Sequence, residues 1–142
     1  ASMSAHFEER PQTLSEKLKR WLPLLAWVLV IFGLSSIPEL PGGGISLPEG
    51  TDKIVHLLEY AVFAFLLYRG LNYEGGCVRW SVTLAVILSG TGLAVLDELY
   101  QSYIPGRDSS MYDLAADAGG IVIGALTALL RDIRRVRKVG EI

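Results

Sequence analysis

Two short segments of the chain carry most of the side chains able to do chemistry. Residues 97–113 read DELYQSYIPGRDSSMYD and place five ionisable groups between two apolar runs. Residues 51–63 read TDKIVHLLEYAVF and add a histidine, a lysine and two acids at the start of another apolar run. Carboxylates near an imidazole bind divalent cations or exchange protons, and an arginine binds phosphate or carboxylate groups. The two segments are therefore the candidate functional site.

Four apolar runs flank these segments, at residues 21–37, 54–71, 80–96 and 114–130 of a 142-residue chain that is 51% hydrophobic. Each run has roughly 17 or 18 residues, enough for a helix to span a hydrocarbon core of about 30 Å. A soluble four-helix bundle would show polar positions every three or four residues, and WLPLLAWVLVIFGL and IVIGALTALL show no such repeat. The sequence predicts an all-α, polytopic membrane protein with four transmembrane helices.

The same runs divide the chain into three parts. Residues 1–20 form a polar N-terminal segment, residues 21–131 the four-helix transmembrane domain, and residues 132–142 a basic tail. The basic EKLKR before the first run also fits a signal peptide, but no A-x-A-like cleavage site follows it, so we expect a retained helix. A single cysteine, Cys77, excludes an intramolecular disulfide and a Cys-based zinc site.

The Lys and Arg residues are distributed unevenly among the polar segments. Eleven of the 13 precede the first run, lie between the second and third, or follow the fourth, whereas Lys53 and Arg107 lie in the other two loops. By the positive-inside rule, we expect both termini in the cytoplasm and residues 38–53 and 97–113 on the outer face of the cell membrane. The basic RDIRRVRK at 131–138 is expected to contact anionic lipid rather than nucleic acid.

Helical spacing places the polar groups of three helices on single faces. Each of three sets is spaced by three or four residues: Asp52, His56 and Glu59; Gly90, Ala94, Asp97 and Gln101; Asp113, Asp117, Gly120 and Gly124. Ionisable groups inside a membrane are costly unless they are paired or face a wet cavity, so these faces are expected to turn into the bundle. The small residues allow close packing, which directs the three sets to one place near the outer membrane edge. Glu98 lies about 100° around its helix and reaches the same cavity or the headgroup region.

The charges in this region do not balance. Two cations, Lys53 and Arg107, face seven acidic or imidazole groups: Asp52, His56, Glu59, Asp97, Glu98, Asp113 and Asp117. Some of the acids must be protonated, solvated or neutralised by a bound group. Carboxylates suit Mg²⁺ or Ca²⁺, and the set His56, Asp97, Asp113 and Asp117 also suits Mn²⁺ or Zn²⁺. The alternative is a network of salt bridges and protonated acids that only holds the helices together.

The loop before the fourth helix contains a turn signal, Pro105 and Gly106, next to Arg107. As a rigid fork of donors, the guanidinium of Arg107 suits a phosphate or carboxylate on a partner. The next three residues are candidate N-caps for the fourth helix: Asp108, Ser109 and Ser110.

Together the motifs resemble the signature of the VanZ-like family, small bacterial membrane proteins named for a teicoplanin-resistance protein. DKIVHLLEY at 52–60, DELYQ at 97–101, PGR at 105–107 and DLAADAGG at 113–120 match its order and spacing, over roughly residues 20–130. The resemblance implies four or so transmembrane helices and a cell-envelope or glycopeptide-resistance context, without a settled reaction. It carries over the signature residues Asp52, Lys53, His56, Asp97, Glu98, Gln101, Arg107 and Asp113. Asp117 departs from the usual asparagine and adds a negative charge.

Three functions fit these residues. In the first, an outward-facing pocket binds an envelope lipid, a lipid-linked precursor headgroup or a glycopeptide, with a divalent cation as an optional bridge. Its residues are Asp52, Lys53, His56, Glu59, Asp97, Glu98, Gln101, Arg107, Asp113 and Asp117. In the second, an intramembrane enzyme acts on a lipid phosphate, with His56, Glu59 and Asp97 as its candidate catalytic residues. His56 or Glu59 serves as general base, Asp97, Asp113 and Asp117 hold a divalent metal, and Arg107 binds the phosphate. The third is a proton- or ion-coupled carrier, for which four helices are few unless the protein dimerises.

Overall fold

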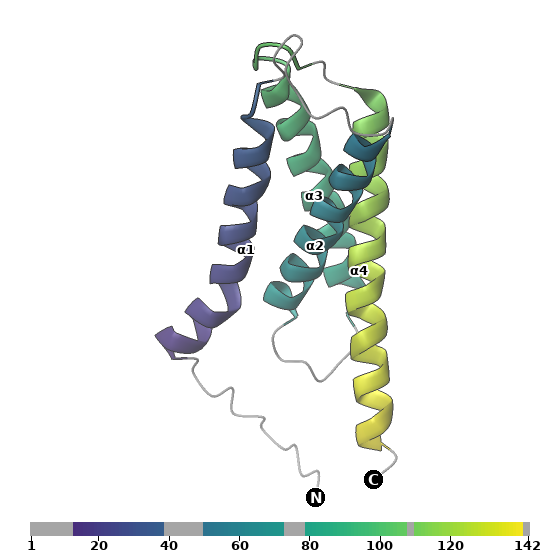
Figure 1. Cartoon of the computed structure of the whole chain (residues 1–142). Helices are drawn as coiled ribbons and strands as arrows, with labels where there is room; N and C mark the ends of the chain where they lie inside the picture. Colours follow the sequence, from purple (N-terminus) through teal and green to yellow (C-terminus); the bar gives the residue numbers. More distant parts are fainter. Residues whose placement is uncertain (1–12, 39–49, 73–78, 108–109, 141–142) are drawn as a thin grey trace, which may run out of the picture.

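The computed structural model describes residues 13–38, 50–72, 79–107 and 110–140 (Figure 1). Within these residues every regular element is an α-helix: α1 (Leu14–Ser35), α2 (Thr51–Leu71), α3 (Trp80–Gln101) and α4 (Met111–Gly140). Each of the four is long and apolar enough to cross a membrane. The prediction of an all-α chain with four spanning helices is confirmed.

The first and the last helix extend beyond the apolar runs that predicted them, α1 at its N-terminal end and α4 at its C-terminal end. α1 begins at Leu14 because Thr13 and Glu16 form a capping box, in which Glu16 N donates to Thr13 Oγ1 and Thr13 N donates to Glu16 Oε2. At the other end of the chain, α4 continues to Gly140 without a break. The basic segment after residue 131 is thus the continuation of a membrane helix.

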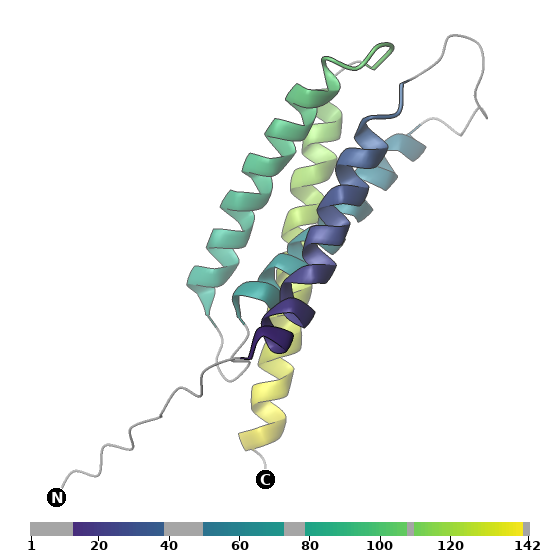
Figure 2. The ribbon, with the colours of Figure 1, turned by 90° about the vertical axis from the view of Figure 1, so that its left-hand side faces the viewer.

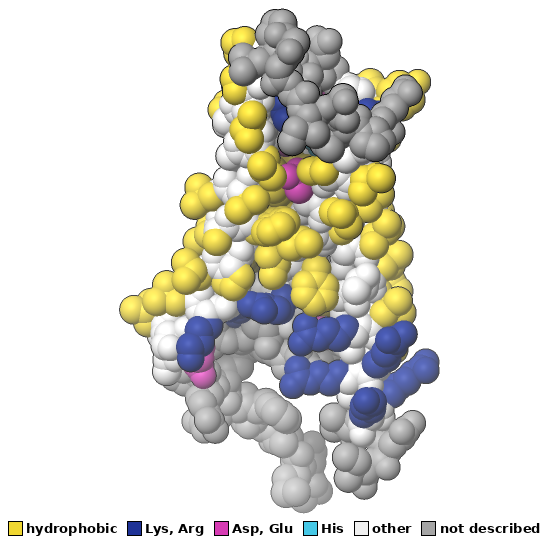
Figure 3. Space-filling view, in the orientation of Figure 1, with side chains coloured by type: hydrophobic (Ala, Val, Ile, Leu, Met, Phe, Trp, Pro, Cys, Tyr) yellow, Lys and Arg dark blue, Asp and Glu magenta, His cyan; other side chains and the backbone are white. Residues whose placement is uncertain are grey.

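The helices alternate in direction, which gives the bundle two chemically different ends (Figures 1 and 2). At the upper end in both views, α1 and α3 finish while α2 and α4 begin. We call this the acidic end, because it holds Asp97, Glu98, Asp113 and Asp117. The opposite end, where α2 and α4 finish, is the basic end, and Figure 3 shows Lys and Arg side chains gathered there below a band of hydrophobic side chains.

The most extensive helix contact joins α2 to α4. A Cβ atom placed on Gly120 or Gly124 would collide with the backbone carbonyl oxygens of Leu57 and Ala61, respectively. Only glycine lets the two backbones lie this close, so the predicted small-residue seam of α4 is present. On α3, Gly90 plays a milder version of the same role against the side chain of Ile121.

The bundle places apolar side chains outside and several ionisable ones inside. Leu29, Leu88 and Leu96 are more than half exposed, whereas Asp97 and Asp117 are completely buried. In water this arrangement would be unfavourable, but in a bilayer the exposed leucines contact acyl chains and the acids are shielded from them. Apart from Asp52, which is exposed, the polar residues of the predicted polar faces are buried inside the bundle, as their helical spacing predicts.

Candidate functional site

The centre of the acidic end is a contact between α2 and α4. His56 Nδ1 lies 3.0 Å from Asp117 Oδ1, and both side chains are buried. The glycine seam one and two turns further along α4 holds the two backbones together at this level, so the longer side chains above it meet face to face. Asp117 therefore orients the imidazole of His56.

α3 adds a second carboxylate to this pair. Glu98 is buried, and its Oε2 accepts a hydrogen bond of 3.0 Å from Ser110 N, just before α4 begins. One ligand atom from each of His56, Glu98 and Asp117 lies within 4.8 Å of the other two. Two ligands of one ion, each about 2.0–2.5 Å from it, lie at most about 4–5 Å apart. The spacing of these three ligand atoms is therefore that of a possible cation site.

Several polar atoms around this cluster are buried yet accept or donate no hydrogen bond in the described part of the chain. They are Glu98 Oε1, Asp117 Oδ2, Glu59 Oε1 and Arg107 Nε. Leaving a buried donor or acceptor unpaired costs about 1–3 kcal/mol each, more for charged groups. Among the described residues, the acidic end is therefore short of hydrogen-bond partners and of positive charge.

Asp97 belongs to a separate network that ties α1 to α3. Its Oδ2 accepts hydrogen bonds from Ser35 Oγ at 2.9 Å and from Gln101 Nε2 at 3.0 Å, and Gln101 Nε2 also lies 3.1 Å from Ser35 Oγ. All three side chains are buried. Asp97 Oδ1 has no partner among the described residues. The network locks the two helix ends together beside the His56 cluster.

Lys53 occupies the rim of the acidic end. Its Nζ lies 3.0 Å from Asp113 Oδ1 on α4 and 2.7 Å from Asp52 Oδ2 on its own helix. Asp52 is largely exposed, whereas Asp113 is buried. Lys53 thus forms ion pairs with two acids, and neither of them belongs to the cluster of His56, Glu98 and Asp117. Asp113, one turn before Asp117, faces Lys53 rather than His56.

Arg107 follows a turn in which Gly106 has a φ of 81°. Because this left-handed conformation suits glycine, the Pro105–Gly106 pair fixes the turn locally. Arg107 is half-buried and forms no ion pair with any described residue. Its guanidinium remains available for an anionic group at the mouth of the site.

Helical periodicity alone did not predict two polar residues of the acidic end, Ser35 and Ser110. Ser35 ends an otherwise apolar run, and the paired serines at 35–36 were the available signal. Ser110 both donates its backbone N–H to Glu98 and caps α4, since its Oγ accepts a hydrogen bond from Tyr112 N. The other two candidate caps, Asp108 and Ser109, lie outside the described residues.

These features define a class: a helical membrane protein whose polar interior is concentrated at one end of a four-helix bundle. Residues 7–132 match the model of the VanZ/LLP1 family, nearly the whole chain, and the protein belongs to that family. The resemblance indicated by its motifs is confirmed. Searches of the curated proteins and of the solved structures give no match.

Proposed function

We propose that this VanZ-family membrane protein binds the anionic headgroup of an envelope lipid or lipid-linked precursor at the acidic end, through a divalent cation held by His56, Glu98 and Asp117. The cation bridges the protein to a phosphate, and Arg107 contacts the same group. Sequestering such headgroups protects the envelope and gives resistance to glycopeptides of the teicoplanin type.

The observation that carries this proposal is the three-ligand cluster. Two buried carboxylates and an imidazole lie within cation-binding distance, and Glu98 Oε1 and Asp117 Oδ2 have no hydrogen-bond partner in the described chain. Transferring carboxylates from water into the interior of a membrane protein is costly unless a positive charge compensates them. A divalent ion supplies that charge, and the mixed nitrogen and oxygen ligands favour Zn²⁺ or Mn²⁺ over Mg²⁺ or Ca²⁺.

Three protein ligands leave coordination positions for an outside group, as in metal sites that bind substrates. A headgroup phosphate completes the coordination and meets the fork of Arg107 donors. The asymmetry of basic residues supports placing this end at the outer face, where envelope precursors are used.

Cation binding is tested by calorimetric titration of metal-stripped protein in detergent with Zn²⁺, Mn²⁺, Mg²⁺ and Ca²⁺. We expect one ion per chain, with affinity reduced at least about tenfold in Glu98→Gln, because ligand charge sets cation affinity. Asp132→Asn, an acid-to-amide change at the basic end, should bind like wild type. Equal affinities for Glu98→Gln and wild type would exclude this ligand set.

Headgroup binding is tested separately with farnesyl pyrophosphate as a soluble probe of a lipid-linked pyrophosphate. Wild type should bind it more tightly with the cation than with chelator, and Arg107→Gln should bind it weakly. Arg137→Gln removes an arginine from the exposed part of α4 and is the matched control. In cells, Arg107→Gln at normal expression should lose teicoplanin protection while Arg137→Gln keeps it; the same protection in both would refute the headgroup role.

An intramembrane enzyme is the second candidate, favoured by the His56–Asp117 contact of 3.0 Å. A carboxylate that orients an imidazole prepares it to act as general base. Phosphate release from the same pyrophosphate probe, abolished by chelator and by His56→Gln, would establish this activity. If the protein binds the probe but releases no phosphate, the enzyme is excluded and headgroup binding is the function supported.

A further inference from the structure

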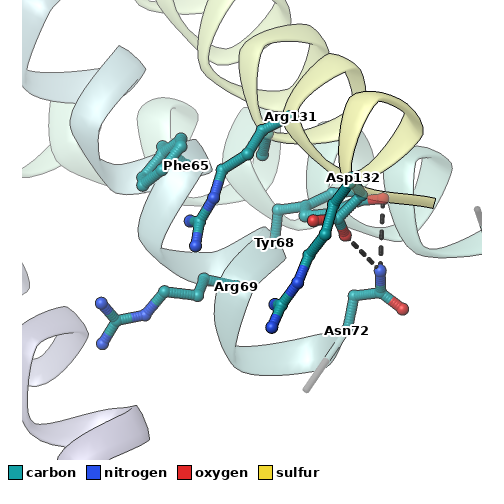
Figure 4. A pocket seen from close by; sticks show the side chains of 8 residues that line it. Phe65, Tyr68, Arg69, Asn72, Arg131 and Asp132 are labelled. Carbon is teal, nitrogen blue, oxygen red and sulfur yellow. Dashed lines mark hydrogen bonds between the residues drawn. The ribbon is translucent and has the colours of Figure 1, made fainter. Parts of the chain in front are cut away.

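A small cleft opens at the basic end, far from the acidic cluster. Its volume is about 90 Å³, and α2 and α4 supply its lining: Phe65, Tyr68, Arg69, Asn72, Ala128, Arg131, Asp132 and Arg135. Figure 4 shows the guanidinium groups of Arg69 and Arg131 extending to the same side, away from the Asn72–Asp132 pair. The cleft thus has a basic side and a hydrogen-bonded polar side.

The arginines of this cleft are not neutralised by its only carboxylate. Asp132 Oδ2 accepts a 2.6 Å hydrogen bond from the uncharged amide Asn72 Nδ2. None of Arg69, Arg131 and Arg135 forms an ion pair with a described residue. Three guanidinium groups against one carboxylate leave a net positive charge in the cleft.

Two of the arginines are held in place by neutral contacts that leave donors free. The guanidinium carbon of Arg131 lies 5.8 Å from the ring centroid of Phe65, which is a cation–π contact. This contact uses one face of the guanidinium group and leaves the N–H groups at its edge for other partners. Arg69 Nη2 donates a 3.3 Å hydrogen bond to the backbone oxygen of Lys19, which uses one of five N–H donors. The positive groups are therefore partly preorganised for an anion.

The cleft also lies at a specific level of the membrane helices. Figure 3 shows the hydrophobic band of the visible face giving way to Lys and Arg side chains at this end. Phospholipid phosphates lie at the corresponding boundary of a bilayer, and basic pockets between helices bind anionic headgroups there. We propose that the cleft binds the phosphate of an anionic phospholipid from the leaflet at the basic end.

The rest of α4 provides a control for general surface charge. Arg134 and Arg137 are exposed on the same helix and at the same end, but they do not line the cleft. The double variants Arg131→Gln/Arg135→Gln and Arg134→Gln/Arg137→Gln change the net charge equally. Only the first pair should matter if the cleft, rather than the basic surface, recognises the lipid.

The test follows thermal unfolding of the full chain in detergent by tryptophan fluorescence while phosphatidylglycerol, phosphatidylcholine or inorganic phosphate is added. Phosphatidylglycerol should stabilise wild type and the Arg134/Arg137 variant alike. Its apparent affinity should fall roughly 30-fold in the Arg131/Arg135 variant, the effect of two charges near the headgroups. Asp132→Asn, which removes the negative charge of the cleft, should tighten it about fivefold.

Several results would overturn this assignment. Equal weakening in the two double variants would indicate diffuse surface charge, and equal stabilisation by phosphatidylcholine would exclude an anionic headgroup. Stabilisation by inorganic phosphate at the same concentrations would make free phosphate the ligand. If the Arg131/Arg135 variant does not fold, Asp132→Asn decides, since unchanged phosphatidylglycerol affinity in that variant contradicts the proposal. Chelator is present throughout, so that cation-dependent headgroup binding at the acidic end does not contribute to these readouts.

Discussion

His56 Nδ1 and Asp117 Oδ1 lie 3.0 Å apart although 61 positions of sequence separate them. The contact depends on Gly120 and Gly124, which bring the backbone of α4 against Leu57 and Ala61. The absence of side chains at these two glycines thus sets the geometry of the His56–Asp117 pair, which begins one turn away on α4. The predictions below separate the roles of the seam, the pair and their neighbours.

Gly124→Ala should destabilise the bundle, because its Cβ would meet the carbonyl oxygen of Ala61 and push α4 away from α2. We expect a loss of about 1–3 kcal/mol, the usual cost of overpacking. Gly92→Ala on α3 is the matched control, since nothing lies within 4 Å of its new Cβ. Thermal unfolding in detergent measures both, and equal melting temperatures would contradict the role of the seam.

Asp117→Asn should separate folding from cation binding. The amide, which the family pattern usually has at this position, can still hydrogen-bond His56, so the melting temperature should stay close to that of wild type. Cation affinity should nevertheless fall at least about tenfold, because a charged ligand is lost. Calorimetry and thermal unfolding on one preparation check the two expectations independently; undiminished cation affinity would count against Asp117 as a ligand.

Ser35→Ala should weaken the join between α1 and α3. It removes the donor that gives Asp97 Oδ2 a 2.9 Å hydrogen bond inside the bundle. The expected loss is about 1–2 kcal/mol, measured by thermal unfolding. Thr127→Ala is the control, because Thr127 is exposed and its hydroxyl donates a hydrogen bond to Ile123 O on its own helix. A variant of Ser35 as stable as that control would show that the network contributes little.

Both ends of the chain should lie in the cytoplasm, because eleven of 13 Lys and Arg residues lie before the first apolar run, near the connection between the second and third, or after the fourth. Alkaline phosphatase fused after residue 142 should be inactive, and the same enzyme inserted after Tyr103, in the loop after α3, should be active. Activity at the C-terminal fusion would invert the topology. The headgroup proposal would then apply to the inner leaflet.

The transmembrane architecture could be predicted from the sequence because a bilayer imposes a simple requirement on it. Four apolar runs of sufficient length indicated four helices, and the structure contains them. The ends were harder to predict. Hydropathy reports which residues tolerate hydrocarbon, whereas the start of α1 at Leu14 depends on the capping box of Thr13 and Glu16.

The sequence by itself determined which face of each helix is polar, since 3.6-residue periodicity places His56 with Glu59 and Asp113 with Asp117. Only the tertiary structure decided which of these groups meet. Asp117 pairs with His56 and Asp113 with Lys53, while Glu98 joins the cation-sized cluster and Asp97 turns to Ser35. Such pairings depend on the axial offset and rotation of one helix against another. Those are set by contacts such as the glycine seam, and periodicity within a single helix carries no information about them.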